Sequence, residues 1–178
     1  LYHIVSFSSY DHILFLVVLT APYAFKDWTR LLLLVSFFTL GHTLSLLLGV
    51  YDIINLKVNV VEWLIPFTII IMALYNIFTA GKASKKSNPI IIVCLVLFFG
   101  LIHGLGFANS FEAVVGSDES TLLSIIEFAL GIELGQFVIV FSVLFFGFLG
   151  QTIFRLSSRD WVMVLSAVVI GLMLPLIV

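Results

Sequence analysis

The sequence predicts an all-α fold, a bundle of six transmembrane helices with both termini on the extracytoplasmic side. Of its 178 residues, 62% are hydrophobic and only 10% are charged, whereas a soluble domain has about 45–50% and about 25%. The mean hydropathy is +1.25. The apolar runs have the length of helices and lack the short alternating segments of an outer-membrane barrel. We therefore expect one transmembrane domain over residues 1–178.

Each predicted span approaches the roughly 20 apolar residues that a helix needs to cross hydrocarbon. The six spans cover residues 8–24, 29–50, 58–80, 89–110, 121–150 and 160–178. The first span is short, and the fifth is long enough to tilt, kink or extend past the bilayer. Because the connecting loops are short, we expect neighbouring helices to pack antiparallel.

The basic residues set the expected orientation. Lys57 lies in the second loop. The other seven lie in the first, third and fifth loops: Lys26, Arg30, Lys82, Lys85, Lys86, Arg155 and Arg159. Lysine and arginine concentrate in cytoplasmic loops, so these odd loops are expected inside and both termini outside. No basic residue precedes the first span, which fits a signal peptide that has been removed.

Several classes of function are disfavoured by composition. The net charge of −2 and the lack of a basic patch argue against a nucleic-acid partner. Cys94 is the only cysteine, so an internal disulfide and a thiolate metal cluster are excluded. The three methionines are scattered, which gives little support for a Cu(I) route.

The predicted topology collects the ionisable residues at one depth. All four histidines and four of the acids fall in the outer layer: His3, Asp11, His12, His42, Glu62, His103, Glu127 and Glu133. Ionisable groups within a membrane are costly and usually mark a functional site. Residues from separate helices that share one depth are expected to act together.

The fourth span carries the most distinctive motif, a glycine-rich apolar stretch around a histidine. Gly100, Gly104 and Ala108 follow one another at intervals of four residues, and His103 lies between the two glycines. Small residues at this spacing let helix backbones approach closely. We therefore expect His103 to be pressed against other helices that bring further ligands.

The first span begins with a carboxylate beside an imidazole. Asp11 precedes His12, and Ser8 and Ser9 lie one helical turn before the histidine, where both can face its ring. This pattern suits a metal ligand with polar support. Alternatively, Asp11 caps the helix N-terminus, where an acid complements the helix dipole.

The second span has a polar patch around His42. Thr39 and Ser45 flank this histidine at helical neighbour spacing, so their hydroxyls could hydrogen-bond its second ring nitrogen and fix the tautomer of a ligand. Serine and threonine also serve as ordinary contacts between membrane helices.

The fifth span places Glu133 between Gly131 and Gly135, with Gln136 one turn further on. A charge at the bilayer centre costs roughly 2.5–3.5 kcal/mol, which a bound metal or a shared proton would offset. The alternative is a neutral glutamic acid that hydrogen-bonds to Gln136 or to a histidine. Glu127 lies on another face of the same helix and is a secondary candidate.

Few other polar residues lie within the spans. Glu62 stands beside Trp63 and can be an interfacial residue with an aromatic-belt partner. In the inner half, Ser36 and Asn76 are the main polar groups, which is a sparse set for a conduction path. Imidazoles with one or two carboxylates suit a borderline divalent ion such as Ni²⁺, Co²⁺, Zn²⁺ or Fe²⁺.

Four segments, residues 9–16, 38–45, 99–108 and 131–136, resemble the HupE/UreJ family of small polytopic bacterial membrane proteins. Residues 2–4 and 61–62 are also similar to it, and Ser8-Ser9 stands where many members have a small residue and glycine. The resemblance implies a multi-pass protein of the bacterial inner membrane that takes up nickel or cobalt. The ligand positions that it implies are His3, Asp11, His12, His42, His103 and Glu133.

Three functions follow as hypotheses. A permease would capture a nickel, cobalt or zinc ion in the outer half of the bilayer and pass it inward. An intramembrane zinc-dependent hydrolase would act on a lipid or lipid-linked substrate, with Asp11 or Glu133 as the general base. An accessory subunit would bind metal without transport. The secondary site candidates are Glu62, Glu127, Gln136, Ser8, Thr39 and Ser45. The expected partners are the metal ion and the lipid bilayer, and self-association into a homo-oligomer stays open.

Overall fold

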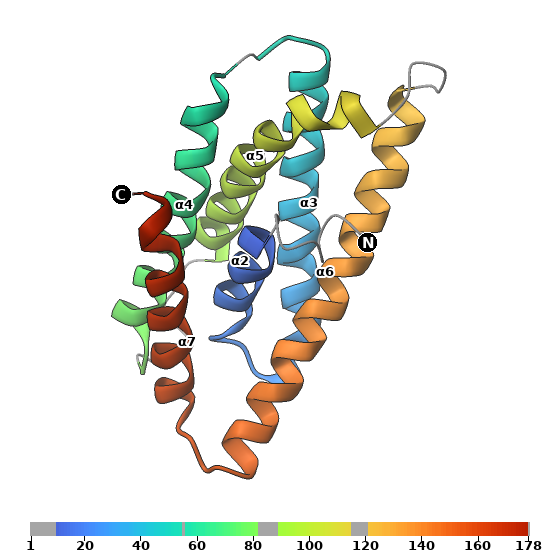
Figure 1. The fold of residues 1–178 in the computed structure, drawn as a ribbon. Helices are drawn as coiled ribbons and strands as arrows, with labels where there is room; N and C mark the ends of the chain where they lie inside the picture. Colours follow the sequence, from blue (N-terminus) through green and yellow to red (C-terminus); the bar gives the residue numbers. More distant parts are fainter. Residues whose placement is uncertain (1–9, 55, 82–88, 115–120, 178) are drawn as a thin grey trace. The chain divides into compact units, whose positions relative to one another are not determined.

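The computed structural model describes residues 10–54, 56–81, 89–114 and 121–177. Over these residues the chain forms helices and no strand, so the all-α prediction is confirmed there (Figure 1). In chain order the elements are α2 (Tyr10–Thr20), the 3₁₀ helix η2 (Phe25–Asp27), α3 (Trp28–Val50), α4 (Val58–Thr79), α5 (Pro89–Val114), α6 (Thr121–Thr152), α7 (Ser158–Met173) and the 3₁₀ helix η4 (Leu174–Leu176).

Five helical stretches in the described residues are long and apolar enough to cross a membrane. They are Phe25–Val50, Val58–Thr79, Ile90–Ala108, Leu122–Thr152 and Ser158–Leu176, and they coincide with the second to sixth predicted spans. Helix α2 has 11 residues, which at 1.5 Å per residue is about 16 Å, half of a hydrocarbon core. The chain is thus a multi-pass membrane protein. A sixth crossing and the outward termini stay predictions.

Helix α2 is short because of the residue that follows it. Pro22 has no N–H, so it cannot donate to the carbonyl of Val18 one turn earlier, as a helical residue would. The side chain of Asn76 in α4 replaces that donor, with Nδ2 2.7 Å from the Val18 oxygen. The next turn closes through the Tyr23 N–H, which donates to the Thr20 carbonyl at 2.9 Å. A neighbouring helix thereby supplies the hydrogen-bond donor for a carbonyl at the buried C-terminal end of α2.

The chain divides into two compact units. The first unit comprises Leu1–Leu32, Pro66–Lys86 and Gly135–Val178, and the second comprises Leu33–Ile65 and Ser87–Leu134. Helices α3, α4 and α6 each contribute a segment to both units. The prediction of one domain over residues 1–178 stays a prediction.

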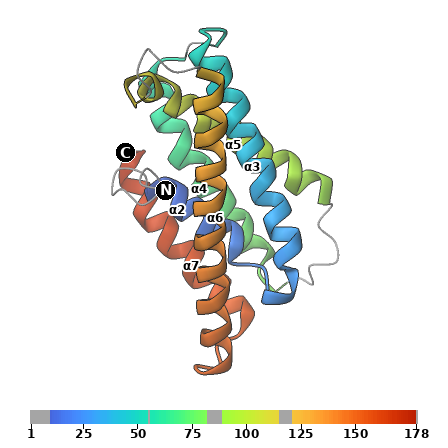
Figure 2. The same ribbon diagram turned by 90° about the vertical axis from the view of Figure 1, so that its right-hand side faces the viewer.

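In the first unit, α2 packs against α7, and Figure 2 shows the same two helices as neighbours after a quarter turn. Both helices bury apolar residues, among them Phe15 and Leu16 of α2. Near the C-terminal end of α6, Gly147 and Gly150 lie against the indole ring of Trp161 in α7. A Cβ at Gly147 would lie 3.3 Å from the indole nitrogen, a tight contact, so glycine there lets the ring pack closely on α6.

In the second unit, α3 and α5 touch backbone to backbone (Figures 1 and 2). A Cβ on Gly41 of α3 would overlap the Leu97 carbonyl of α5. A Cβ on Gly100 would overlap the Phe38 carbonyl, and one on Gly104 would overlap the His42 carbonyl. The predicted close approach at Gly100 and Gly104 is confirmed.

Candidate functional site

His103 is buried in the second unit, with 1% of its surface exposed. Its Nδ1 lies 2.8 Å from the main-chain oxygen of Phe99, one turn earlier in α5. Because a carbonyl can only accept, Nδ1 carries the proton in this hydrogen bond. In the neutral ring, Nε2 then holds the lone pair. Helix α5 therefore fixes the tautomer in which Nε2 has the lone pair, and metal-ligating histidines are commonly fixed in this way.

His42 is equally buried, on α3, and it shares an aromatic neighbour with His103. The ring of Phe38 meets His103 edge-on at 5.2 Å between centroids and lies 6.4 Å from His42. The ring of Phe128, in α6, lies 6.3 Å from the His42 ring between centroids. The structure thus places two of the predicted ligands, from different helices, beside one shared aromatic ring, that of Phe38.

The two hydroxyls beside His42 serve the backbone. Thr39 Oγ1 donates to the Val35 carbonyl at 3.2 Å, and Ser45 Oγ donates to the His42 carbonyl at 3.0 Å. A hydroxyl has a single proton but can also accept a hydrogen bond. The prediction that these hydroxyls orient the His42 ring stays a prediction.

Glu133 accepts a hydrogen bond from Ser36, a residue that was expected in the inner half of the membrane. Ser36 of α3 donates its hydroxyl proton to Glu133 Oε1 of α6 at 2.5 Å, the short end of the range for a hydroxyl on a carboxylate. Ser36 was expected in a sparse inner path, yet it joins two helices of the second unit at the acid. Glu127 and Glu62, two of the secondary candidates, are exposed on the surface of the protein.

Asp11 and His12 form a local pair at the start of α2, in the first unit. Asp11 Oδ1 accepts the main-chain N–H of His12 at 2.9 Å and lies 3.1 Å from its Nδ1. The carboxylate therefore satisfies a main-chain donor at the helix start and also contacts the imidazole, while its role as a metal ligand stays a prediction. As at His103, an oxygen on Nδ1 leaves Nε2 as the lone-pair nitrogen. His12 is itself buried, with 6% exposed.

The predicted site residues are divided between the units. His42, His103 and Glu133 belong to the second unit, whereas Asp11, His12 and the fully buried Gln136 belong to the first. His3 and Ser8 lie outside the described residues. Within residues 10–54, 56–81, 89–114 and 121–177, no three His, Cys, Asp or Glu side chains are grouped to hold a metal ion. A complete ligand set at these positions stays a prediction.

Sequence reasoning missed the aromatic residues around the histidines and assigned them to packing or lipid contact. Phe107 and Phe128 stack in parallel at 4.6 Å, and Phe111 meets Phe128 edge-on at 5.6 Å. One signal was available in the sequence, because Phe38 stands four residues before His42 and so shares its helix face. An apolar wall of this kind lowers the local dielectric around any charge placed beside it.

Comparison with known proteins supports the resemblance seen in the motifs. The family model described as HupE / UreJ protein matches residues 1–177. No match was found among curated proteins or among solved structures. Because the family match runs over nearly the whole length, the chain belongs to the HupE/UreJ family.

Proposed function

We propose that this protein is a permease of the bacterial inner membrane that carries a divalent transition-metal ion of the nickel and cobalt class. Membership of the HupE/UreJ family supports that class of cargo. The observation that carries the proposal is the His103 tautomer. Its Nδ1–H donates to the Phe99 carbonyl, so Nε2 has a lone pair that can coordinate a metal ion. A buried imidazole held in this way is typical of a ligand.

The ligand chemistry follows from the residues that surround the α3–α5 contact. His103 and His42 supply imidazole nitrogens, which suit Ni²⁺, Co²⁺ and Zn²⁺. Glu133 supplies an anionic oxygen on a neighbouring helix, positioned by Ser36, and a carboxylate would offset part of the cation's charge. Asp11, His12 and His3 are the remaining proposed ligands.

Transport requires that the ion leave the site as well as bind it. In the proposed cycle the ion is captured in the outer half of the bilayer, where the predicted topology places these ligands. Movement of the helices then opens the site inward. Helices whose backbones touch can shift only as packed bodies, so we propose that α3 and α5 move together and carry His42 and His103 with them.

Radioactive metal uptake tests the proposal. Cells that lack their own nickel importer, expressing the protein, should accumulate ⁶³Ni²⁺ or ⁵⁷Co²⁺ above vector controls. His103→Ala and His42→Ala should lose this accumulation while retaining normal amounts of membrane-inserted protein. Leu44→Ala is a matched control on α3, because Leu44 is half exposed and lies on the lipid side of the same helix.

The alternatives give different results in the same cells. Metal bound to the purified protein without accumulation in cells would contradict the permease. Release of an acyl chain or head group that stops with His103→Ala would identify a metal-dependent hydrolase. Tight stoichiometric binding with neither flux nor hydrolysis would identify an accessory subunit.

A further inference from the structure

An aromatic cluster of the second unit lies beside its two buried histidines, toward one end of the helices. It consists of Phe107 and Phe111 of α5 and Phe128 of α6, and it packs with Leu46 of α3 and Ile125 of α6. Phe111, Leu46 and Ile125 are each 1% exposed, and Phe107 is 7% exposed. We call these five residues the aromatic plug, because they fill the interior between three helices with apolar side chains.

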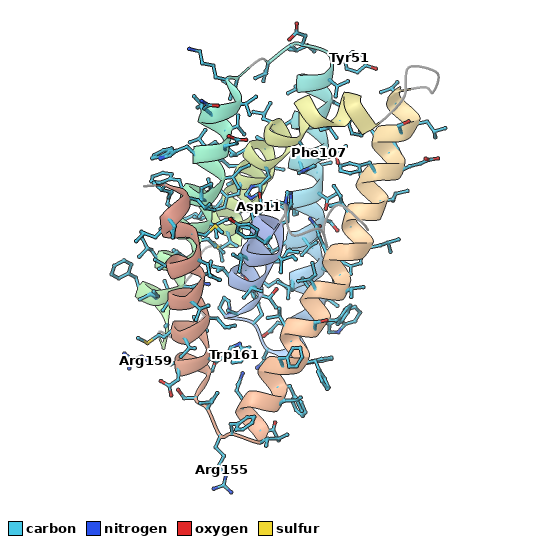
Figure 3. All side chains as sticks on the ribbon, viewed as in Figure 1. Asp11, Tyr51, Phe107, Arg155, Arg159 and Trp161 are labelled. Carbon is cyan, nitrogen blue, oxygen red and sulfur yellow. The ribbon has the colours of Figure 1, made fainter. Side chains whose placement is uncertain are left out.

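The aromatic plug lies on the same side of all three proposed ligands of this unit. Leu46 and Phe107 each follow one of the two histidines by four residues, about one helical turn. On α6, Phe128 precedes Glu133 by five residues, and α6 begins near the ends of α3 and α5 (Figures 1 and 2). Figure 3 labels Phe107 on the side of Tyr51, which follows the end of α3. The predicted topology places this end on the extracytoplasmic side, from which the proposed permease takes its ion.

One side chain, that of Phe128, connects the aromatic plug to the histidines. Its ring stacks in parallel on Phe107 at 4.6 Å between centroids and meets Phe111 edge-on at 5.6 Å. The same ring lies 6.3 Å from the ring of His42. A hydrocarbon ring has no polar atom that could replace the hydration shell of an ion, and apolar constrictions of this kind close ion paths by excluding water. The stacked rings therefore block access to His42 from this end.

The helices of the aromatic plug differ in how firmly they are joined. The backbone contact of α3 and α5 extends to the level of the plug, because a Cβ on Gly49 would overlap the Cβ of Ala108. Helix α6, in contrast, is divided between the two units after Leu134. Gly131 and Gly135 lie within four residues of that point, and glycine is the weakest helix former after proline. The N-terminal part of α6 is therefore the part of the plug that can move as a separate piece.

We propose that Phe107, Phe111 and Phe128 form the outer gate of the permease, and that the structure holds this gate closed. The gate opens when the N-terminal part of α6 moves away from the α3–α5 pair, which separates Phe128 from Phe107 and uncovers His42. Closing it behind the ion keeps the two sides of the membrane separate, as alternating access requires. This inference rests on the function proposed above and adds the step that admits the ion.

A reversible bridge across the gate tests whether it must open. Cys94→Ser removes the only native cysteine, and Phe107→Cys and Phe128→Cys are then joined by a short bis-methanethiosulfonate linker that dithiothreitol removes. The bridge should reduce ⁶³Ni²⁺ uptake about tenfold, and its removal should restore uptake. The matched control joins Val61→Cys of α4 to Gly106→Cys of α5, where a Cβ on Gly106 would lie 3.2 Å from the Val61 side chain. That bridge does not involve α6 and should leave uptake unchanged.

Thiol labelling tests the gate without any metal. In the Cys94→Ser protein with His42→Cys, a charged methanethiosulfonate added on the extracytoplasmic side should react slowly, and Phe128→Ala should speed the reaction about tenfold. Leu130→Ala is the control on α6, since Leu130 is 57% exposed, and it should leave the rate unchanged. The gate is overturned if the bridged protein takes up nickel at the unbridged rate, or if Phe128→Ala leaves the labelling rate unchanged. Wild-type protein that accumulates no nickel would contradict only the permease, because labelling still reports on the gate.

Discussion

The two units bury polar groups in different ways. In the second unit, three glycines bring the backbones of α3 and α5 into contact, and the buried imidazoles lie beside that contact. In the first unit, the short helix α2 ends inside the protein, where Asn76 supplies the donor that Pro22 lacks and a cavity follows. In the second unit, buried polar groups lie beside a contact that only glycine permits. In the first unit, a buried carbonyl receives its hydrogen bond from a side chain of another helix. The first arrangement should be intolerant of added atoms and the second of lost donors.

The largest effect should come from adding a methyl group at the α3–α5 contact. In Gly104→Ala the new Cβ would overlap the His42 carbonyl and Ser45 Oγ, and overpacking at backbone should cost about 3 kcal/mol. Thermal melting of detergent-solubilised protein measures it. Gly171→Ala is the control, since nothing lies within 4 Å of a Cβ at that glycine. Equal melting temperatures for the two variants would contradict the close contact.

A smaller loss should follow from removing the donor at the end of α2. Asn76→Ala leaves the buried Val18 carbonyl unsatisfied, at a cost of about 2 kcal/mol. Pro22→Ala restores a main-chain N–H that can donate to the same carbonyl. In a double-mutant cycle, Pro22→Ala should therefore offset part of the Asn76→Ala loss. Strictly additive changes would show that the two residues do not serve one acceptor.

The smallest effect concerns the link between α3 and α6 in the second unit. Ser36→Ala removes the hydroxyl that donates to Glu133 and should destabilise the protein by about 1 kcal/mol. Ser142→Ala is the comparison within α6, because the Ser142 hydroxyl is exposed and donates to Val138 of its own helix at 2.8 Å. A loss in Ser142→Ala as large as in Ser36→Ala would remove the distinction.

Sequence reasoning found those features that depend on spacing along one helix. The four-residue interval of Gly100 and Gly104 predicted a close helix contact, and apolar run length predicted five of the spans. The end of α2 was placed at residue 24 instead of Thr20, because the partner that satisfies Val18 comes from α4, 58 residues away. Such replacement of a donor by a distant side chain leaves no local pattern.

The candidate site was only partly predictable for the same reason. The histidines were identified by the cost of placing them in a membrane, and their burial agrees with that argument. The Ser36–Glu133 bond joins residues 97 positions apart, and no spacing within a helix indicates it. The aromatic neighbours of His42 come from α6 as well as from α3, so their proximity depends on tertiary packing.

Nickel content per chain is the measurement that tests the central claim most directly. Protein purified after expression in nickel-supplemented medium should hold close to one ion per chain by mass spectrometry, and His103→Ala and His42→Ala should each lose most of it. Glu127→Gln, an exposed carboxylate on the same helix as Glu133, should retain it. Unchanged nickel in both histidine variants, with each protein folded, would contradict a metal site at the α3–α5 contact.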